Sequence, residues 1–235
     1  MKRHYLILFA LTAILSAFLV VISLNVKLTP ASASAQAEPV DQLLRILLAI
    51  GSVILALCIV ALVYNVVVFR RRKGDMEDGP PIQGHNLLEI AWVLVPLAIV
   101  LWLAFQGAMV LQEITSAPTG EEELEVKVSA FQWGWLFAYP AYGVISAELH
   151  LPVGRPVRFE LTSSDVVHSL WVPEWRVKQD AVPGKVTELR ITPTTAGEYK
   201  VLCAELCGLA HAMMKARVTV TERADFEQWV KEQKQ

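Results

Sequence analysis

The segment that begins at Cys203 and ends at Met214 gathers side chains that bind soft metal ions. It reads C-A-E-L-C-G-L-A-H-A-M-M, and the other two donors are Cys207 and His211. Thiolate and thioether sulfur suit copper far better than magnesium, calcium or manganese. A mononuclear electron-transfer copper uses one cysteine, two histidines and a weak methionine, so the second cysteine here allows both sulfurs to bridge two copper ions. The set needs one more imidazole, and His168 is available.

Other interpretations of this segment explain only part of it. Two cysteines in an exported domain could form a disulfide, but a separation of four residues is short and leaves His211 and Met214 unexplained. Zinc accepts two cysteines and two histidines, yet it has no use for a methionine. Met213 and Met214 could equally fill gaps in a core. The donors taken together favour copper.

The spacing Cys-x3-Cys-Gly-x2-His-x2-Met, with D-V-V-H-S-L-W-V-P upstream at 165–173, resembles subunit II of haem-copper cytochrome c oxidases. That subunit carries the dinuclear copper centre called CuA, and the resemblance extends over nearly the whole chain after its N-terminal segment. The metal ligands that it implies are the side chains of His168, Cys203, Cys207, His211 and Met214 and the backbone carbonyl of Glu205. The resemblance also implies a magnesium ion shared with subunit I through the Glu205 carboxylate, and oxygen ligation suits magnesium.

Three further positions gain a role through the same resemblance. In the family, the first tryptophan of a Q-W-x-W element receives the electron; here it is Trp133, although F-Q-W-G-W departs from the commoner G-H-Q-W-Y-W. Asp165 is expected to attract a basic cytochrome c, because complementary charge raises the association rate; from the residues alone it is equally an ordinary turn acid. Glu89 is expected at the cytoplasmic mouth of a proton path, although an acid in a first helical turn also complements the helix dipole.

The composition places much of the chain in a membrane. It has 235 residues, 54% of them hydrophobic, and a formal net charge of −2, with a mean hydropathy of +0.43. Such hydropathy implies membrane segments. The near-zero net charge excludes a generic nucleic-acid-binding protein, which would show a basic patch or stripe. Three cysteines are too few for a disulfide scaffold.

Three apolar stretches, at 5–24, 43–69 and 87–111, dominate the first half. A bilayer core of about 30 Å needs roughly 20 apolar helical residues, so the second and third stretches are each long enough to span it as a helical hairpin. The basic run R-R-R-K at 70–73 marks the cytoplasmic side, which places the C-terminal half on the opposite face. In a bacterium this predicts the inner membrane, with the C-terminal domain on the periplasmic or outer face.

The first stretch has two interpretations. A charged start, an apolar run and the A-x-A-like alanines within 31–37 resemble a cleaved secretory signal. The run is longer than a usual signal core, so an uncleaved third helix is the alternative. The predicted domains are therefore a signal or N-terminal segment at 1–37, a transmembrane hairpin at 38–115 and an exported domain at 116–235.

The exported domain is predicted to be all-β, a cupredoxin-like Greek-key barrel or sandwich. Apolar and polar residues alternate in short runs separated by glycine and proline turns, which is typical of half-buried strands. The clearest runs are 123–130, 157–161, 185–191, 199–202 and 216–221, followed by an amphipathic helix at 225–234. Three ligands then fall in the loop before the last strand, and His168 is expected from a separate loop.

The resemblance implies the electron-input subunit of a cytochrome c oxidase. Electrons from cytochrome c pass through the copper centre to haem in subunit I, where oxygen is reduced and protons are pumped. Subunits I and III, cytochrome c and the lipid bilayer are the expected partners, and no catalytic residue is expected in this chain. Two alternatives remain: a membrane-tethered copper-delivery protein, and subunit II of a quinol oxidase, which characteristically lacks the copper ligands.

Overall fold

The computed structural model describes residues 2–71, 73–76, 78–79, 81, 83–117 and 122–234. Arg72 of the basic loop and the 118–121 segment at the start of the predicted exported domain lie outside this range. Contacts divide the chain into two compact units. The first comprises residues 1–28 and 42–109, and the second comprises 29–41 and 110–235.

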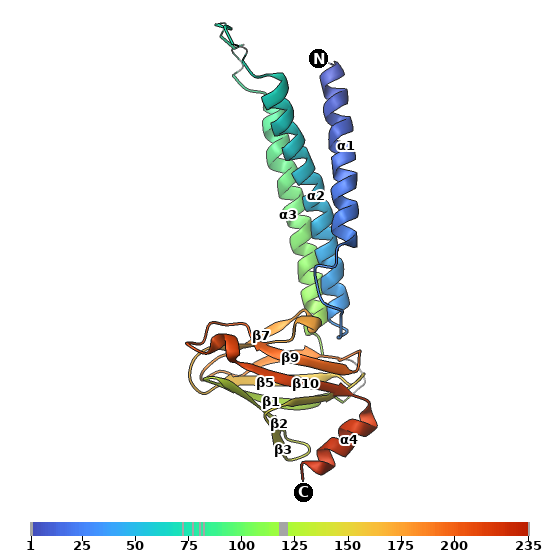
Figure 1. Cartoon of the computed structure of the whole chain (residues 1–235), viewed down its shortest axis with the longest axis vertical. Coiled ribbons are helices and arrows are strands. Elements are labelled where there is room, and N and C mark those ends of the chain that lie inside the picture. Colours follow the sequence, from blue (N-terminus) through green and yellow to red (C-terminus); the bar gives the residue numbers. More distant parts are fainter. Residues whose placement is uncertain are drawn as a thin grey trace. The chain divides into compact units, whose positions relative to one another are not determined.

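The first unit is helical (Figure 1). It contains α1 (Lys2–Asn25) and most of α2 (Ala37–Val68) and α3 (Asn86–Thr115); the start of α2 and the end of α3 belong to the second unit. In the described part of the chain, these three helices are long and apolar enough to cross a membrane. No described residue of α3 is buried, and a helix that is apolar on every side is stable only in lipid or inside a larger protein. The prediction of apolar membrane helices is confirmed, and the first apolar stretch is also helical.

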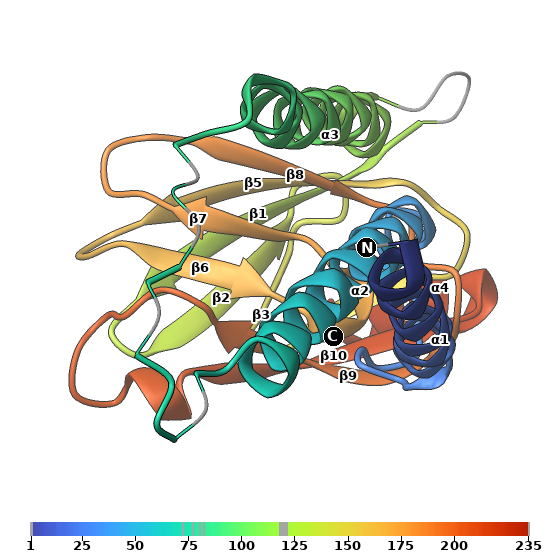
Figure 2. The same ribbon diagram turned by 90° about the horizontal axis from the view of Figure 1, so that it is seen from above.

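The second unit is built around two facing β-sheets (Figures 1 and 2). The first sheet has the order β3-β2-β1-β5-β8, with strands at Val144–Ser146, Gly134–Tyr139, Leu124–Phe131, Val157–Ser163 and Thr187–Ile191. The second has the order β4-β10-β9-β6-β7, with strands at Leu149–Pro152, Lys215–Thr221, Gly197–Cys203, His168–Trp171 and Lys178–Ala181. Short 3-10 helices at Pro173–Trp175 (η1) and His211–Met213 (η2) and the terminal helix α4 (Arg223–Glu232) complete the unit.

Alternation along the strands produces the core. In β1 every second side chain from Leu124 to Ala130 is buried, and β5 repeats the pattern from Val157 to Ser163. Each sheet contains one parallel pair, β1 with β5 and β10 with β4, among otherwise antiparallel pairs. This two-sheet sandwich confirms the predicted all-β, cupredoxin-like fold.

The division into domains at 1–37, 38–115 and 116–235 stays a prediction. Residues 29–41 belong to the same compact unit as the two sheets. We call this segment the N-terminal strap. The Ala33 amide donates to the Glu174 carbonyl at 3.0 Å, and the Ala33 carbonyl accepts the Thr194 amide at 3.0 Å. The Ala35 amide donates to the Thr192 carbonyl at 3.0 Å. These hydrogen bonds join residues more than 130 positions apart, so no local sequence pattern could have revealed them.

One arginine fastens both ends of the strap. Arg176 donates through Nε and Nη2 to the two carboxylate oxygens of Asp41, at 2.7 and 3.2 Å, and also to the Pro30 carbonyl. Both side chains of the ion pair are largely buried, with 6% and 13% of their surfaces exposed. Arg176 has a left-handed backbone, with φ at 64°. Its position beyond η1 is therefore fixed by backbone and side chain together.

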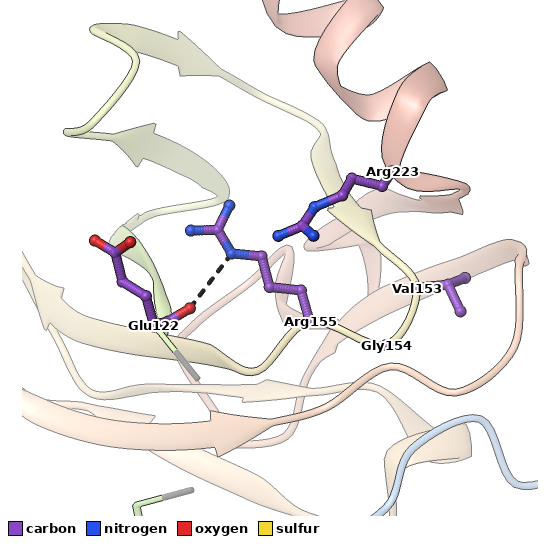
Figure 3. Close-up of a pocket in the computed structure, with 5 residues that line it drawn as sticks. All are labelled: Glu122, Val153, Gly154, Arg155 and Arg223. Atoms are coloured by element: carbon purple, nitrogen blue, oxygen red, sulfur yellow. Dashed lines mark hydrogen bonds between the residues drawn. The ribbon is translucent and has the colours of Figure 1, made fainter. Parts of the chain in front are cut away.

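A polar hollow of about 330 Å³ lies beside the start of α4. Figure 3 shows the guanidinium groups of Arg155 and Arg223 pointing into it. Arg155 donates to the Glu122 carbonyl at 3.5 Å and to the Tyr142 hydroxyl at 3.1 Å. None of the residues lining this hollow belongs to the predicted metal ligands.

Candidate metal centre

The predicted ligands are placed by two neighbouring strands and one loop of the second sheet. His168 is the first residue of β6, Cys203 is the last residue of β9, and the two strands pair with Leu170 opposite Cys203. The remaining ligands follow in the loop and η2 that precede β10. His168 was expected on a loop, but it begins a strand. The first three residues of β6 are all buried, so the alternation that identifies a half-exposed strand is missing.

All the predicted donors meet in one cluster. The Sγ atoms of Cys203 and Cys207 are 3.7 Å apart, and both cysteines are free. The Nδ1 atom of His168 lies 3.9 Å from Cys203 Sγ, and that of His211 lies 3.5 Å from Cys207 Sγ. Met214 Sδ is 3.7 Å from Cys207 Sγ, and the Glu205 carbonyl oxygen is 3.2 Å from Cys203 Sγ.

The donor chemistry fits a bridged copper pair. Two sulfurs lie at the middle of the cluster, and each sulfur has its own imidazole beside it. One tetrahedral zinc ion would bind the two cysteines and the two histidines, and the Met214 thioether and the Glu205 carbonyl would then bind no metal. Soft sulfur with imidazole is the combination that copper prefers. The residues therefore fit the group that the sequence predicts.

Several of the predicted ligands are buried. His168 and Met214 are fully buried, and only 2% of Cys207 is exposed. Burial, together with the hydrogen bond and charge of Cys203, raises the pKa of the Cys207 thiol to about 11. Thiols bind metals as thiolates, so metal binding must release a proton from this residue.

Asp165 holds His168 in the orientation that a ligand needs. Its Oδ1 atom lies 2.8 Å from His168 Nε2, and its Oδ2 accepts the Gln132 amide at 2.6 Å. Partial burial raises the pKa of Asp165, but the hydrogen bonds from His168, Val166 and Gln132 outweigh it and lower the pKa to about 2. A carboxylate that accepts the second ring N–H fixes the tautomer and leaves Nδ1 for the metal. Both carboxylate oxygens of Asp165 therefore form hydrogen bonds within the domain. Its predicted role in docking the electron donor stays a prediction.

Trp133 lies against the metal-binding loop. Its Nε1 donates to the Cys207 carbonyl at 3.2 Å, and 40% of the residue is exposed. Trp133 is thus partly exposed to solvent and bonded to the backbone of a predicted ligand, which is compatible with the predicted receipt of electrons. The residues around it that sequence reasoning left without a role are Gln132, Gly208 and Trp135. Gln132 and Trp135 belong to the unusual F-Q-W-G-W element, and Gly208 directly follows the second cysteine of the metal-binding segment.

Glu89 lies in the other compact unit, in the first turn of α3. Its Oε1 accepts the His85 amide at 3.2 Å, and His85 Nδ1 accepts the Leu88 amide at 3.2 Å. These reciprocal bonds satisfy backbone N–H groups at the helix start in the manner of a capping box. Glu89 therefore has a structural role as a cap, and its place in a proton path stays a prediction.

The fold and the cluster together define a membrane-anchored, cupredoxin-like protein with a copper-type donor set. Two family models match the chain: the transmembrane domain of cytochrome c oxidase subunit II over residues 22–110, and its periplasmic domain over 143–221. Cytochrome c oxidase subunit 2 of Synechocystis sp. is 34% identical, over 94% of this chain and 81% of its own length. The chain belongs to the cytochrome c oxidase subunit II family.

Two further relatives show the range of the similarity. The periplasmic domain of subunit II of the cytochrome oxidase of Bradyrhizobium japonicum is 30% identical; the match covers 50% of this chain and 97% of that domain, with a TM-score of 0.46. Quinol oxidase subunit 2 of Bacillus spizizenii is 28% identical over 79% of this chain and 60% of its own length.

Proposed function

We propose that this chain accepts electrons from a reduced cytochrome c at a dinuclear copper centre and delivers them to haem in subunit I of a haem-copper oxidase. The observation that carries the proposal is the pair of cysteine sulfurs 3.7 Å apart, each with an imidazole nitrogen beside it. When bound, the copper pair supplies a one-electron carrier. Reduction of oxygen and pumping of protons take place in the partner subunit.

The chain contributes a rigid, largely dry frame. His168 and Cys203 belong to paired strands, and Met214 is followed directly by β10. Ligands held by strands move little when the charge of the metal changes, which favours rapid electron transfer. The carboxylate of Glu205 is exposed, and we assign it to a magnesium ion shared with subunit I, since magnesium prefers oxygen ligands.

The helices imply the surroundings in which this function operates. The predicted location is the inner membrane of a bacterium, with the sandwich on the periplasmic face and the basic residues around Arg70 on the cytoplasmic face. The apolar surface of α3, none of whose described residues is buried, is expected to meet lipid or the helices of subunits I and III.

The two alternative functions, quinol oxidation and copper delivery, place different requirements on these residues. A quinol oxidase subunit has no need of soft metal donors, whereas all six proposed ligands are present here and lie together. A copper-delivery protein needs donors from which the metal exchanges readily, whereas His168, Cys207 and Met214 are buried. The donor set therefore favours a resident copper centre and a cytochrome donor.

Copper analysis of the full-length chain, purified in detergent with its companion subunits, tests the proposal. We expect two copper atoms per chain from this centre and an electron-spin spectrum in which one unpaired electron is shared by both. Cys207→Ser is expected to abolish that spectrum, whereas Cys58→Ser, which changes an exposed cysteine of α2, leaves it intact. A single, freely exchangeable copper in the wild-type chain would contradict the proposal and favour delivery.

A further inference from the structure

We propose that Gln132 is a positioning residue that ties Trp133 to the metal-binding loop and thereby sets the rate of electron input. The inference rests on the proposed function and adds a residue to it. Its basis is a shared acceptor: the Cys207 carbonyl receives hydrogen bonds from Gln132 Nε2 at 2.7 Å and from Trp133 Nε1 at 3.2 Å. A carbonyl oxygen has two lone pairs, and these two donors occupy both.

Gln132 also reaches the other side of the cluster. Its backbone amide donates to Asp165 Oδ2 at 2.6 Å, and Asp165 Oδ1 lies 2.8 Å from His168 Nε2. Gln132 follows β1 of the first sheet, whereas the strands that carry His168 and Cys203 belong to the second. One residue therefore links the turn of one sheet to two ligands held by the other.

Glycine at position 208 permits this close approach. A Cβ atom there would lie 3.0 Å from Gln132 Nε2 and 3.3 Å from Trp133 Cζ2, closer than side chains normally come. The backbone of Gly208 also has φ at +120°, a region that other residues rarely adopt. Space and conformation both require glycine where the loop meets the Gln132–Trp133 pair.

The side chain of Gln132 is not needed to form the turn itself. Phe131 pairs with Gly134 across the β1–β2 hairpin, and four further pairs extend the register to Lys127 and Ala138. A Cβ on Gly134 would come within 2.7 Å of the Phe131 ring, so that ring lies over the turn and helps to close it. The amide group of Gln132 is therefore free to serve the metal-binding loop.

Loss of this amide leaves Trp133 attached by its own, longer hydrogen bond. A hydrogen bond contributes about 0.5–1.5 kcal/mol, so its removal lowers the equilibrium constant for attachment of the indole by roughly twofold to tenfold. Electron transfer falls steeply with distance, so the input rate follows that population. We expect Gln132→Leu to lower the rate of electron input at saturating donor by up to this factor while the KM for the donor stays near its wild-type value.

The test uses the assembled, copper-loaded oxidase and rapid mixing with reduced cytochrome c. Gln132→Leu and Gln132→Glu, which keeps the shape but loses the donor group, are compared with Gln228→Leu, a matched change in the exposed part of α4. Gly208→Ala provides an independent way of pushing the pair apart. The fluorine resonance of 5-fluorotryptophan at position 133, assigned with Trp133→Phe, reports indole attachment in the copper-free chain as well as in the oxidase.

Slower input, a shifted Trp133 resonance and an unchanged copper spectrum in both Gln132 variants support the inference. An unchanged input rate or an unchanged resonance overturns it, as does loss of copper from the variants, which would make Gln132 a determinant of the metal site instead. Failure of the proposed function is a different result, because the wild-type protein would then lack the shared-electron copper spectrum.

Discussion

The Nε2 atom of His168 lies 2.8 Å from Oδ1 of Asp165, three residues earlier, on the ring edge opposite the nitrogen that faces Cys203. The fully buried imidazole is therefore held between a carboxylate and a thiol. This arrangement gives Asp165 a role inside the metal site that its sequence position, just before the first ligand, did not disclose.

Removal of this carboxylate should weaken the metal site. Because groups that orient a metal-binding histidine typically contribute 10–100-fold to metal affinity, Asp165→Ala is expected to lower copper retention by about that factor. Competition with a copper chelator measures it, with Asp180→Ala as the control. If Asp165 served only to attract the donor, copper retention would stay at the wild-type level and the KM for cytochrome c would rise.

Two substitutions at Glu89 distinguish its role as a helix cap from its predicted role in a proton path. Glu89→Gln keeps an oxygen that can accept the His85 amide, whereas Glu89→Ala removes it. If the carboxyl group also feeds protons to the oxidase, both variants should slow oxygen consumption, and only the alanine variant should loosen the start of α3 in hydrogen exchange. If Glu89→Gln turned over at the wild-type rate, capping of α3 would be the only role left for Glu89.

The terminal helix should detach more readily in acid. The His150 ring stacks on Trp229 of α4, with centroids 4.1 Å apart and planes 11° from parallel. Burial lowers the pKa of His150 below its ordinary value of 6.5, against the raising effect of Glu148 and alongside the lowering effect of Arg217. The detached state regains the ordinary pKa and binds the proton first.

Docking of α4 should accordingly be independent of pH above about 6.5 and weaken as the pH falls from there through the lowered pKa of the packed histidine. Hydrogen exchange of the α4 amides in the full chain measures this change. His150→Phe keeps a stacking ring without a titrating group, and a pH dependence that persists in that variant would assign the effect to another residue.

The ion pair between Arg176 and Asp41 should be needed to keep the N-terminal strap in place. Breaking a largely buried pair costs on the order of 3–5 kcal/mol, because the remaining charge is left without compensation. Arg176→Asn removes the guanidinium while tolerating the left-handed backbone. We expect faster hydrogen exchange at the Ala33, Ala35 and Thr194 amides, which form the strap contacts.

Lys127→Gln supplies the comparison, since Lys127 forms ion pairs with more than half of its side chain exposed, and such pairs contribute about 0–1 kcal/mol. Equal exchange in the two variants would show that the strap does not depend on Arg176.

The sequence was most informative where the chemistry is local. Cys203, Cys207, His211 and Met214 lie within twelve residues, so their spacing predicted the cluster, and the runs at 199–202 and 216–221 predicted the strands on either side of this segment. The sequence identifies His168 as the further ligand, but the first three residues of its strand are all buried, so the strand has no alternating pattern and the prediction of a loop was wrong.

The missed features depend on contacts between distant residues. Ser34 donates to the Trp175 carbonyl across 141 positions, and Gln132 reaches the Cys207 carbonyl across 75. The alanine-rich strap resembled a cleavage site because small residues suit both a peptidase and close packing. Cleavage within it stays a prediction, although the burial of Ala33 and Ala37 in the folded unit counts against it.

The N-terminal strap has a consequence for every attempt to study the sandwich in isolation. A fragment that starts after α3 carries all the copper donors, yet it lacks the segment whose carboxylate and carbonyl neutralise and anchor Arg176. Such a fragment leaves the backbone near Pro193 without its bridge to Ser34 and leaves the Arg176 guanidinium without the carboxylate of Asp41. A fragment that keeps the native contacts must also include the N-terminal strap. In this protein the domain is completed by residues that precede its first strand in the sequence.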